Sequence, residues 1–174
     1  MKHFLRLEPA LYSNLRQHLF PPGGECEEAA FLCVMPESGA EGTVFDVVDH
    51  HFAGPDDFVS RESDYLELTD EARASLIQRA HRYGASLVEI HSHLGPYAAA
   101  FSPSDRMGLC ETVPHICWRL KNRPYIALVF AESSFDALVW TVDPGRPMPL
   151  SALLVGDRML TPTLLTYRGW HGRL

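Results

Sequence analysis

Three stretches of the chain carry hydrophobic residues at helical spacing. The first begins at Pro9 and repeats leucine every fourth residue until the Pro-Pro-Gly-Gly run at 21–24 stops it. The second has Thr69 as a capping residue at its start and Gly84 at its end. In the third, Pro114 indicates a kink or a restart before the helix ends near residue 120. These patterns predict helices over residues 9–20, 69–83 and 102 to about 113.

Other stretches favour strands. The run over residues 27–35 is apolar on both faces, which is typical of a strand inside a sheet. Residues 132–134, Glu-Ser-Ser, join two apolar runs as a hairpin. The predicted strands are 4–7, 27–35, 43–52, 86–91, 125–130 and 135–142, with 36–42 as a turn and 150–155 as an added edge strand. The alternation of helices and strands predicts an α/β (α+β) fold with a single mixed β-sheet flanked by helices.

The length of 174 residues fits one domain over residues 1–174. Within it, residues 143–174 form a C-terminal extension of uncertain structure. Its tail, residues 167–174, is expected to be a loop or an extra edge element.

Charge and composition exclude several classes. The formal net charge of −7 disfavours binding to nucleic acid or to an anionic membrane surface. No run of about 18 apolar residues indicates a membrane span, and the N-terminal residues lack the apolar core of a secretory signal. The four cysteines form no C-x-x-C pair, so free thiols in a reducing, cytoplasmic compartment are expected.

The residues that indicate chemistry are two histidines and an aspartate. Residues two apart in a strand point to the same side, so His91 and His93 present two parallel imidazoles. Asp105 follows on the next predicted helix and can add a carboxylate. Two nitrogens, one oxygen and an open fourth position describe a catalytic zinc site rather than a closed structural one. We therefore expect one Zn²⁺ per chain.

Each part of this pattern also has an ordinary structural interpretation. An H-x-H pair by itself is weak evidence for a metal. Ser102-Pro103-Ser104-Asp105 is also a capping box with proline at the first helical position. The two interpretations of Ser102 and Asp105 are compatible, because a residue in the first turn of a helix can still point into a cleft.

The sequence resembles the JAB/MPN metalloenzyme family, whose JAMM signature is an upstream Glu, then H-S-H, then S-x-x-D. His91-Ser92-His93, Ser102-x-x-Asp105 and the frame that begins at Glu27 carry this resemblance, which extends from the first helix to the hairpin at Val142. It implies a cytidine-deaminase-like architecture and a zinc-dependent isopeptidase or peptidase that cleaves after the C-terminal glycine of a ubiquitin-like protein.

The sequence departs from the family pattern at three places. Leu94 stands where the family usually has proline, and Ala30 replaces a frequent glycine. Eight residues separate His93 from Ser102, where seven are usual.

The resemblance also implies roles for two further residues. Glu27, at the mouth of a central strand, is expected to transfer protons as general acid and base, with Glu25, Glu28 and Glu89 as alternatives. The strand period, rather than the resemblance, places Glu89 on the same face as His91, where it would orient a nitrogen of that ligand. Ser102 resembles the serine that hydrogen-bonds the developing oxyanion.

The expected partners follow from the family. They are the C-terminal tail of a ubiquitin-like or sulfur-carrier protein, and E1-like or E2-like proteins of the same pathway. Two alternatives remain at this point. One is a non-catalytic JAB/MPN scaffold or interaction module. The other is a zinc hydrolase of small amide conjugates, which predicts a closed pocket near residues 95–100.

Overall fold

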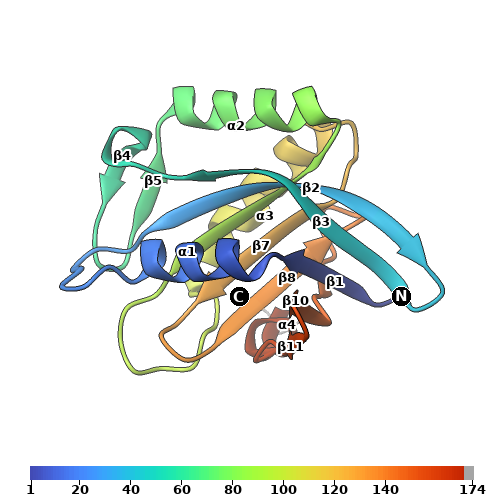
Figure 1. Cartoon of the computed structure of the whole chain (residues 1–174). Coiled ribbons are helices and arrows are strands. Elements are labelled where there is room, and N and C mark those ends of the chain that lie inside the picture. Colours follow the sequence, from blue (N-terminus) through green and yellow to red (C-terminus); the bar gives the residue numbers. More distant parts are fainter. Residues whose placement is uncertain (171–174) are drawn as a thin grey trace.

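A nine-stranded mixed sheet curls through the molecule, and helices lie on both of its faces (Figure 1). The computed structural model describes residues 1–170. The sheet order is β11-β10-β1-β3-β2-β6-β7-β8-β9. Its strands are β1 (His3–Leu7), β2 (Ala29–Gly39), β3 (Gly42–Phe52), β6 (Ser86–Ser92), β7 (Tyr125–Phe130), β8 (Phe135–Trp140), β9 (Met148–Pro149), β10 (Ala152–Val155) and β11 (Arg158–Leu160). The expected mixed sheet with flanking helices is confirmed.

The remaining elements surround this sheet. A separate hairpin pairs β4 (Phe58–Arg61) with β5 (Leu66–Leu68), and a 3₁₀ turn covers Pro55–Asp57. The helices are α1 (Pro9–Leu19), α2 (Asp70–Tyr83), α3 (Pro103–Arg119) and α4 (Leu165–Trp170). None of these helices, within residues 1–170, has the length and apolar character needed to cross a membrane.

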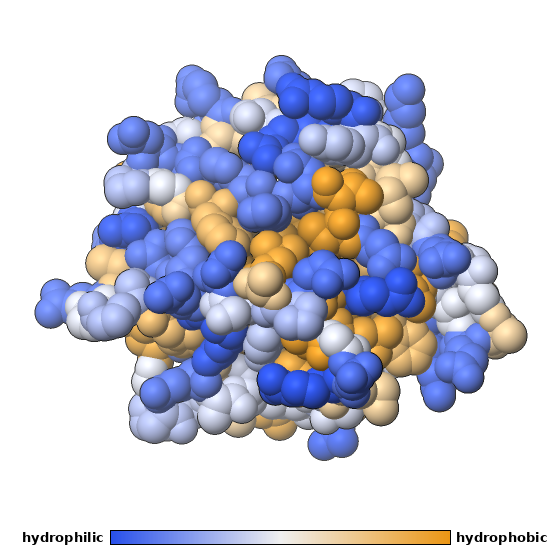
Figure 2. Space-filling view, viewed as in Figure 1, coloured by the Kyte–Doolittle hydropathy of each residue, from blue (hydrophilic) through white to orange (hydrophobic). Residues whose placement is uncertain are grey.

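The sheet separates two hydrophobic cores because its central strands are apolar on both faces. Along β2, Phe31 and Cys33 pack into one core, and Leu32 and Val34 pack into the other. Helix α1 covers the second core in the foreground of Figure 1, and α3 lies behind the sheet. Figure 2 shows the α1 side of the molecule, where hydrophobic residues gather between α1 and α2. The interior position predicted for residues 27–35 therefore holds for the part that forms β2.

Helix α2 begins and ends where its sequence signals predict. The Thr69 hydroxyl accepts a hydrogen bond from the amide of Ala72 at 3.1 Å. Gly84 takes a left-handed conformation with φ of 63°, which glycine adopts without strain. In α3, by contrast, the helix continues past Pro114 to Arg119 without a restart. Pro114 lies on the exposed side, while Val113 and Cys117 of the same turns are buried.

Three expectations about strands and the tail are corrected. Residues 36–39, expected in a turn, continue β2, and the chain reverses at 40–41. Beyond Val34 the strand has no β6 residue beside it, so Pro36 lies at an open edge where its missing N–H costs little. Strand β10 is not an edge strand, because it lies between β1 and β11. Residues 167–170 belong to α4 rather than to a loop; the rest of that tail, 171–174, lies outside the described residues.

Candidate metal centre

The three expected ligands meet where β6 ends and α3 begins. His91 is in β6, and His93 follows the strand's last residue. The amide of His93 donates to the Phe130 carbonyl at 2.7 Å, which extends the β6–β7 pairing and keeps both imidazoles on one side. Asp105 comes from the first turn of α3. The structure thus brings together His91, His93 and Asp105, whose ligand atoms all lie within 4.8 Å of one another.

The separations between these atoms test whether one small cation fits. Nε2 of His91 lies 3.2 Å from Nε2 of His93, and these atoms lie 3.6 Å and 3.1 Å from Oδ2 of Asp105. A tetrahedral zinc site with bonds of about 2.0–2.1 Å places its ligand atoms about 3.3 Å apart. The three atoms therefore already stand near the corners of one face of such a tetrahedron. The donor set and its geometry fit a divalent cation with an open coordination position.

Glu27 lies beside this cluster, two residues before β2 begins. Its amide donates to the Glu62 carbonyl at 2.8 Å, and its Oε1 lies 3.7 Å from Nε2 of His93. The residue is only 5% exposed. Burial raises the pKa of Glu27 from 4.5 to about 7, although the charges of His91 and His93 oppose the rise. A carboxyl group with this pKa exchanges a proton readily near neutral pH.

The alternative glutamates have other surroundings. Glu25 is exposed. Both carboxylate oxygens of Glu28 accept a hydrogen bond from the Arg61 guanidinium, at 3.0 Å each. Glu27 is therefore the glutamate of this segment that lies at the cluster.

The charges of the cluster are strongly coupled. Burial acts to raise the pKa of Asp105, but hydrogen bonds from His91 and His93, together with the charge of His91, outweigh it and hold that pKa well below its usual range. Burial acts to lower the pKa of His91, but Asp105, Glu27 and Glu89 outweigh it and raise that pKa. Asp105 is thus kept ionised, as a metal ligand must be.

Ser102 forms the capping box that the sequence predicts. As the N-cap of α3, its hydroxyl accepts a hydrogen bond from the Asp105 amide at 3.1 Å. Its own amide donates to Oδ2 of Asp105 at 2.6 Å. The capping box therefore orients the carboxylate oxygen that also faces the two imidazoles. Oδ2 of Asp105 thus takes part in the cap and faces both imidazoles, so the capping role of this motif is compatible with metal binding by Asp105.

Glu89 lies on the sheet face of His91, but its hydrogen-bond partner is a residue that the sequence did not indicate. The hydroxyl of Tyr125 donates to Glu89 Oε2. Burial raises the pKa of the Glu89 carboxyl, although the hydrogen bond from Tyr125 opposes the rise. Tyr125 lies in β7, and its place beside Glu89 follows from the β6–β7 register, which local sequence patterns do not reveal.

A surface cleft of about 210 Å³ opens beside the cluster. Gly95, whose φ of 109° disfavours other residues, lets the loop turn away from His93. The cleft is open to solvent, and Tyr97, one of its lining residues, is 81% exposed. The lining residues are Glu27, Ser63, Asp64, His93, Leu94, Gly95, Tyr97, Ala98, Ser102 and Ala131.

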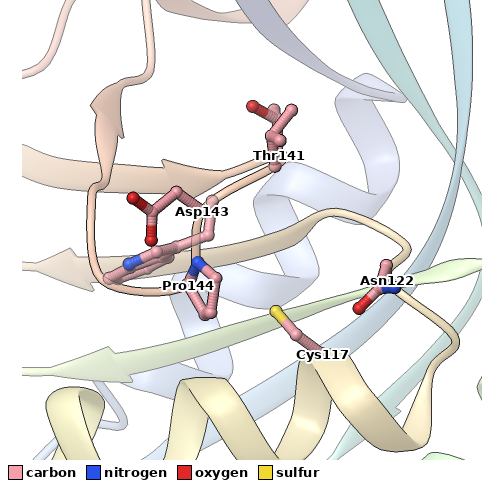
Figure 3. Close-up of a pocket in the computed structure, with 7 residues that line it drawn as sticks. Cys117, Asn122, Thr141, Asp143 and Pro144 are labelled. Carbon is pink, nitrogen blue, oxygen red and sulfur yellow. The ribbon is translucent and has the colours of Figure 1, made fainter.

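A second hollow lies at the other end of α3. It holds about 10 Å³, the size of one water molecule, and is lined by the Cys117 side chain and by residues 140–144 (Figure 3). The sulfur of Cys117 points from the helix toward Pro144, and Asn122 closes one side.

Comparisons with known proteins found no family, and the solved structures they found include two weakly similar ones. The sequence matches no protein-family model and no curated protein. A solution structure of a protein from Salinibacter ruber (strain DSM 13855) is similar over 93% of this chain and 96% of that chain, with 16% identity and a TM-score of 0.41. The STIL N-terminal domain of Trichoplax adhaerens is similar over 75% of this chain and 38% of its own, with 10% identity and a TM-score of 0.34.

Proposed function

We propose that this protein is a zinc-dependent isopeptidase or peptidase of JAB/MPN type that cleaves after the C-terminal glycine of a ubiquitin-like protein. The observation that carries the proposal is the convergence of His91, His93 and Asp105 at tetrahedral spacing, with the Glu27 carboxyl 3.7 Å from His93. In this proposal Zn²⁺ is held by the three residues, and it supplies Lewis acidity that activates water and polarises an amide carbonyl.

Glu27 moves protons during the reaction. As a carboxylate it accepts a proton from the attacking water, and as an acid it gives a proton to the departing amine. In the metal-free protein burial raises the pKa of Glu27 to about 7, and a nearby cation lowers it from there, so the carboxylate form that accepts the proton is well populated at neutral pH.

Ser102 stabilises the oxyanion that forms from the amide carbonyl. The Ser102 oxygen accepts a hydrogen bond from the Asp105 amide and lies 2.9 Å from the Ser104 hydroxyl. In this proposal Ser104 is the donor of that second contact, and Ser102 turns its own hydrogen toward the oxyanion. The side chain also lines the cleft beside His93 and Glu27. One such donor contributes typically about 10²–10³ to the rate.

The form of the cleft supports a polypeptide substrate over a small conjugate. A closed pocket is expected for a small ligand, whereas the loop at Tyr97 leaves this cleft open to solvent. Gly95, Ala98 and Ala131 give its wall little bulk, which suits an extended tail ending in glycine. Sulfur-carrier proteins have the same kind of tail and belong to the proposed substrates. E1-like or E2-like proteins of the pathway are the proposed further partners.

A cleavage assay with defined metal content tests this function. The substrate is a ubiquitin-like protein whose terminal glycine is joined by an amide bond to a reporter. We expect zinc-loaded protein to release the reporter, protein treated with a chelator to be inactive, and added Zn²⁺ to restore the activity.

Glu27→Gln is the decisive variant, because it keeps the three ligands and the size of the side chain. It should bind zinc and lose turnover. Glu25→Gln, an exposed change on the same segment, is its matched control. Equal activity of the wild type and Glu27→Gln, or zinc-loaded wild type that releases no reporter from any such fusion, contradicts the proposal. The second result favours the non-catalytic scaffold.

A further inference from the structure

The segment before α4 is tied to the loop that leads into the metal centre. The Thr163 hydroxyl donates to the Ala99 carbonyl at 2.7 Å. The amide of Phe101 donates to the Thr166 hydroxyl oxygen at 2.9 Å, in the protein interior. These contacts join residues more than 60 positions apart in sequence. The C-terminal segment therefore holds the end of the loop that forms one wall of the cleft.

Asp136 in β8 fixes that segment in turn. Its carboxylate is fully buried and accepts hydrogen bonds from the amides of Leu164 at 3.1 Å, Thr166 at 2.8 Å and Ala137 at 3.0 Å. A buried carboxylate is stable only with such partners. Because Asp136 pairs with Val129, and Val129 pairs with His91, Asp136 and His91 lie in one row on the same sheet face.

Phe101 connects this anchor to the ligands in two ways. Its ring packs edge-on against the His91 imidazole, with centroids 5.7 Å apart. Phe101 also directly precedes Ser102, the N-cap that orients Asp105. A shift of the Phe101 backbone would therefore displace both the ring that packs against His91 and the serine that caps α3 and orients Asp105.

We propose that Thr166 is a positioning residue of the metal centre: held by Asp136, its hydroxyl fixes Phe101 and thereby sets the relative placement of His91 and Asp105. The inference rests on the proposed function in so far as it takes these residues to be metal ligands. It gives the C-terminal segment a role in building the site. Among residues 1–170, the hydrogen bonds of Thr166 go to Phe101 and Asp136 and not to His91, His93 or Asp105, so its effect on the ligands passes through Phe101.

Titration of chelator-treated protein with Co²⁺ tests this inference, because the visible bands of cobalt report its coordination geometry. Thr166→Val removes the hydroxyl and keeps the shape. We expect Co²⁺ affinity to fall about 10-fold or more, as is typical when a residue that supports a ligand is lost. The visible bands should shift, and the Phe101 amide should exchange its hydrogen faster. Thr166→Ser keeps the oxygen and should restore affinity and bands.

Thr112→Val is the matched control, since it removes a threonine hydroxyl that bonds the Gly108 carbonyl within α3. It should leave the Co²⁺ bands unchanged. Should Thr166→Val fail to fold, Thr163→Val loosens the same loop at a less buried position and should weaken Co²⁺ binding to a smaller degree. Wild-type bands and affinity in the folded valine variant overturn the inference alone. A wild type without any Co²⁺ bands overturns the proposed function and this inference together.

Discussion

The two ends of helix α3 both border a hollow, yet they differ in chemistry. At its start, ionisable side chains from β6, α3 and the segment before β2 converge on a cleft of about 210 Å³. At its end, Cys117 and residues 140–144 enclose about 10 Å³. At the start of α3, the carboxylates and imidazoles of the cluster lie 3.1–3.7 Å apart, and burial raises the pKa of one carboxyl, Glu27, to about 7. At the end of α3, burial raises the pKa of the Cys117 thiol and keeps the thiol inert.

A hollow alone therefore does not mark a functional site in this molecule. A cleft in which acidic and basic groups with shifted pKa values face one another is a candidate functional site. The ion pairs elsewhere support this distinction. Arg79 donates one hydrogen bond of 2.9 Å to each carboxylate oxygen of Asp49. Both oxygens are therefore engaged and neither is left to bind a cation. At the metal centre, by contrast, one carboxylate oxygen faces two imidazoles at once.

The largest expected effect is that of His93→Ala. Loss of one of three ligands should remove the zinc and reduce turnover to background, because two ligands hold the ion far more weakly. Metal analysis together with the cleavage assay measures it. His115→Ala, an exposed histidine of α3, should keep both zinc and turnover. Equal zinc content in the two variants contradicts the assignment of His93.

Glu27→Gln should lower turnover by about 10²–10⁴ while zinc stays bound. The wild-type rate should rise with pH as Glu27 ionises, with the acid limb at or below about 7, since a nearby cation favours the carboxylate. The pH dependence of kcat/KM measures this. A profile that keeps the same limb in the glutamine variant assigns the titration to another group.

Ser102→Ala should lower turnover by about 10²–10³ and destabilise the fold by about 1 kcal/mol through the lost cap. Thr69→Ala, which removes the equivalent cap of α2, should lose similar stability and no turnover. The two variants therefore separate the cap from the oxyanion role. If both keep full turnover, Ser102 only caps the helix.

The stability of chelator-treated protein should also respond to Glu27. In the folded protein its pKa is raised from 4.5 to about 7, so the folded state is penalised as pH rises through this interval. The full shift corresponds to about 3 kcal/mol. In chelator-treated protein, Glu27→Gln should therefore increase the free energy of unfolding more near pH 8 than near pH 5. Urea unfolding at both pH values checks the sign, and the opposite order would contradict it.

The smallest effect is expected at the other end of α3. Cys117→Ala should cost about 1 kcal/mol of unfolding free energy, a normal value for trimming a buried side chain. It should leave zinc content and turnover unchanged. A tenfold loss of turnover in this variant would show that the two ends of α3 are coupled in a way that the contacts described above do not provide.

Features of the fold that depend on neighbouring residues can be predicted from the sequence, whereas features that depend on distant segments cannot. The ends of α2 depend on Thr69 and Gly84, and both are local signals. The inner position of β10 does not follow from local patterns, because its pairing with β1 joins distant segments. The hairpin of β4 and β5 gives no clear local signal, since its strands have only four and three residues.

The site divides in the same way. His91, His93 and Asp105 are visible because a strand period and a helix start bring them together over 15 residues. The role of Tyr125 beside Glu89 and that of Thr166 beside Phe101 depend on strand register and on the C-terminal path. Those contacts become visible only once the sheet is assembled.

Metal analysis of wild-type protein purified without chelator tests the central claim most directly. The account predicts about one zinc ion per chain, with cobalt able to replace it in a four-coordinate environment of nitrogen and oxygen ligands. Well-folded protein that contains no metal and takes up neither ion at micromolar concentration would contradict it.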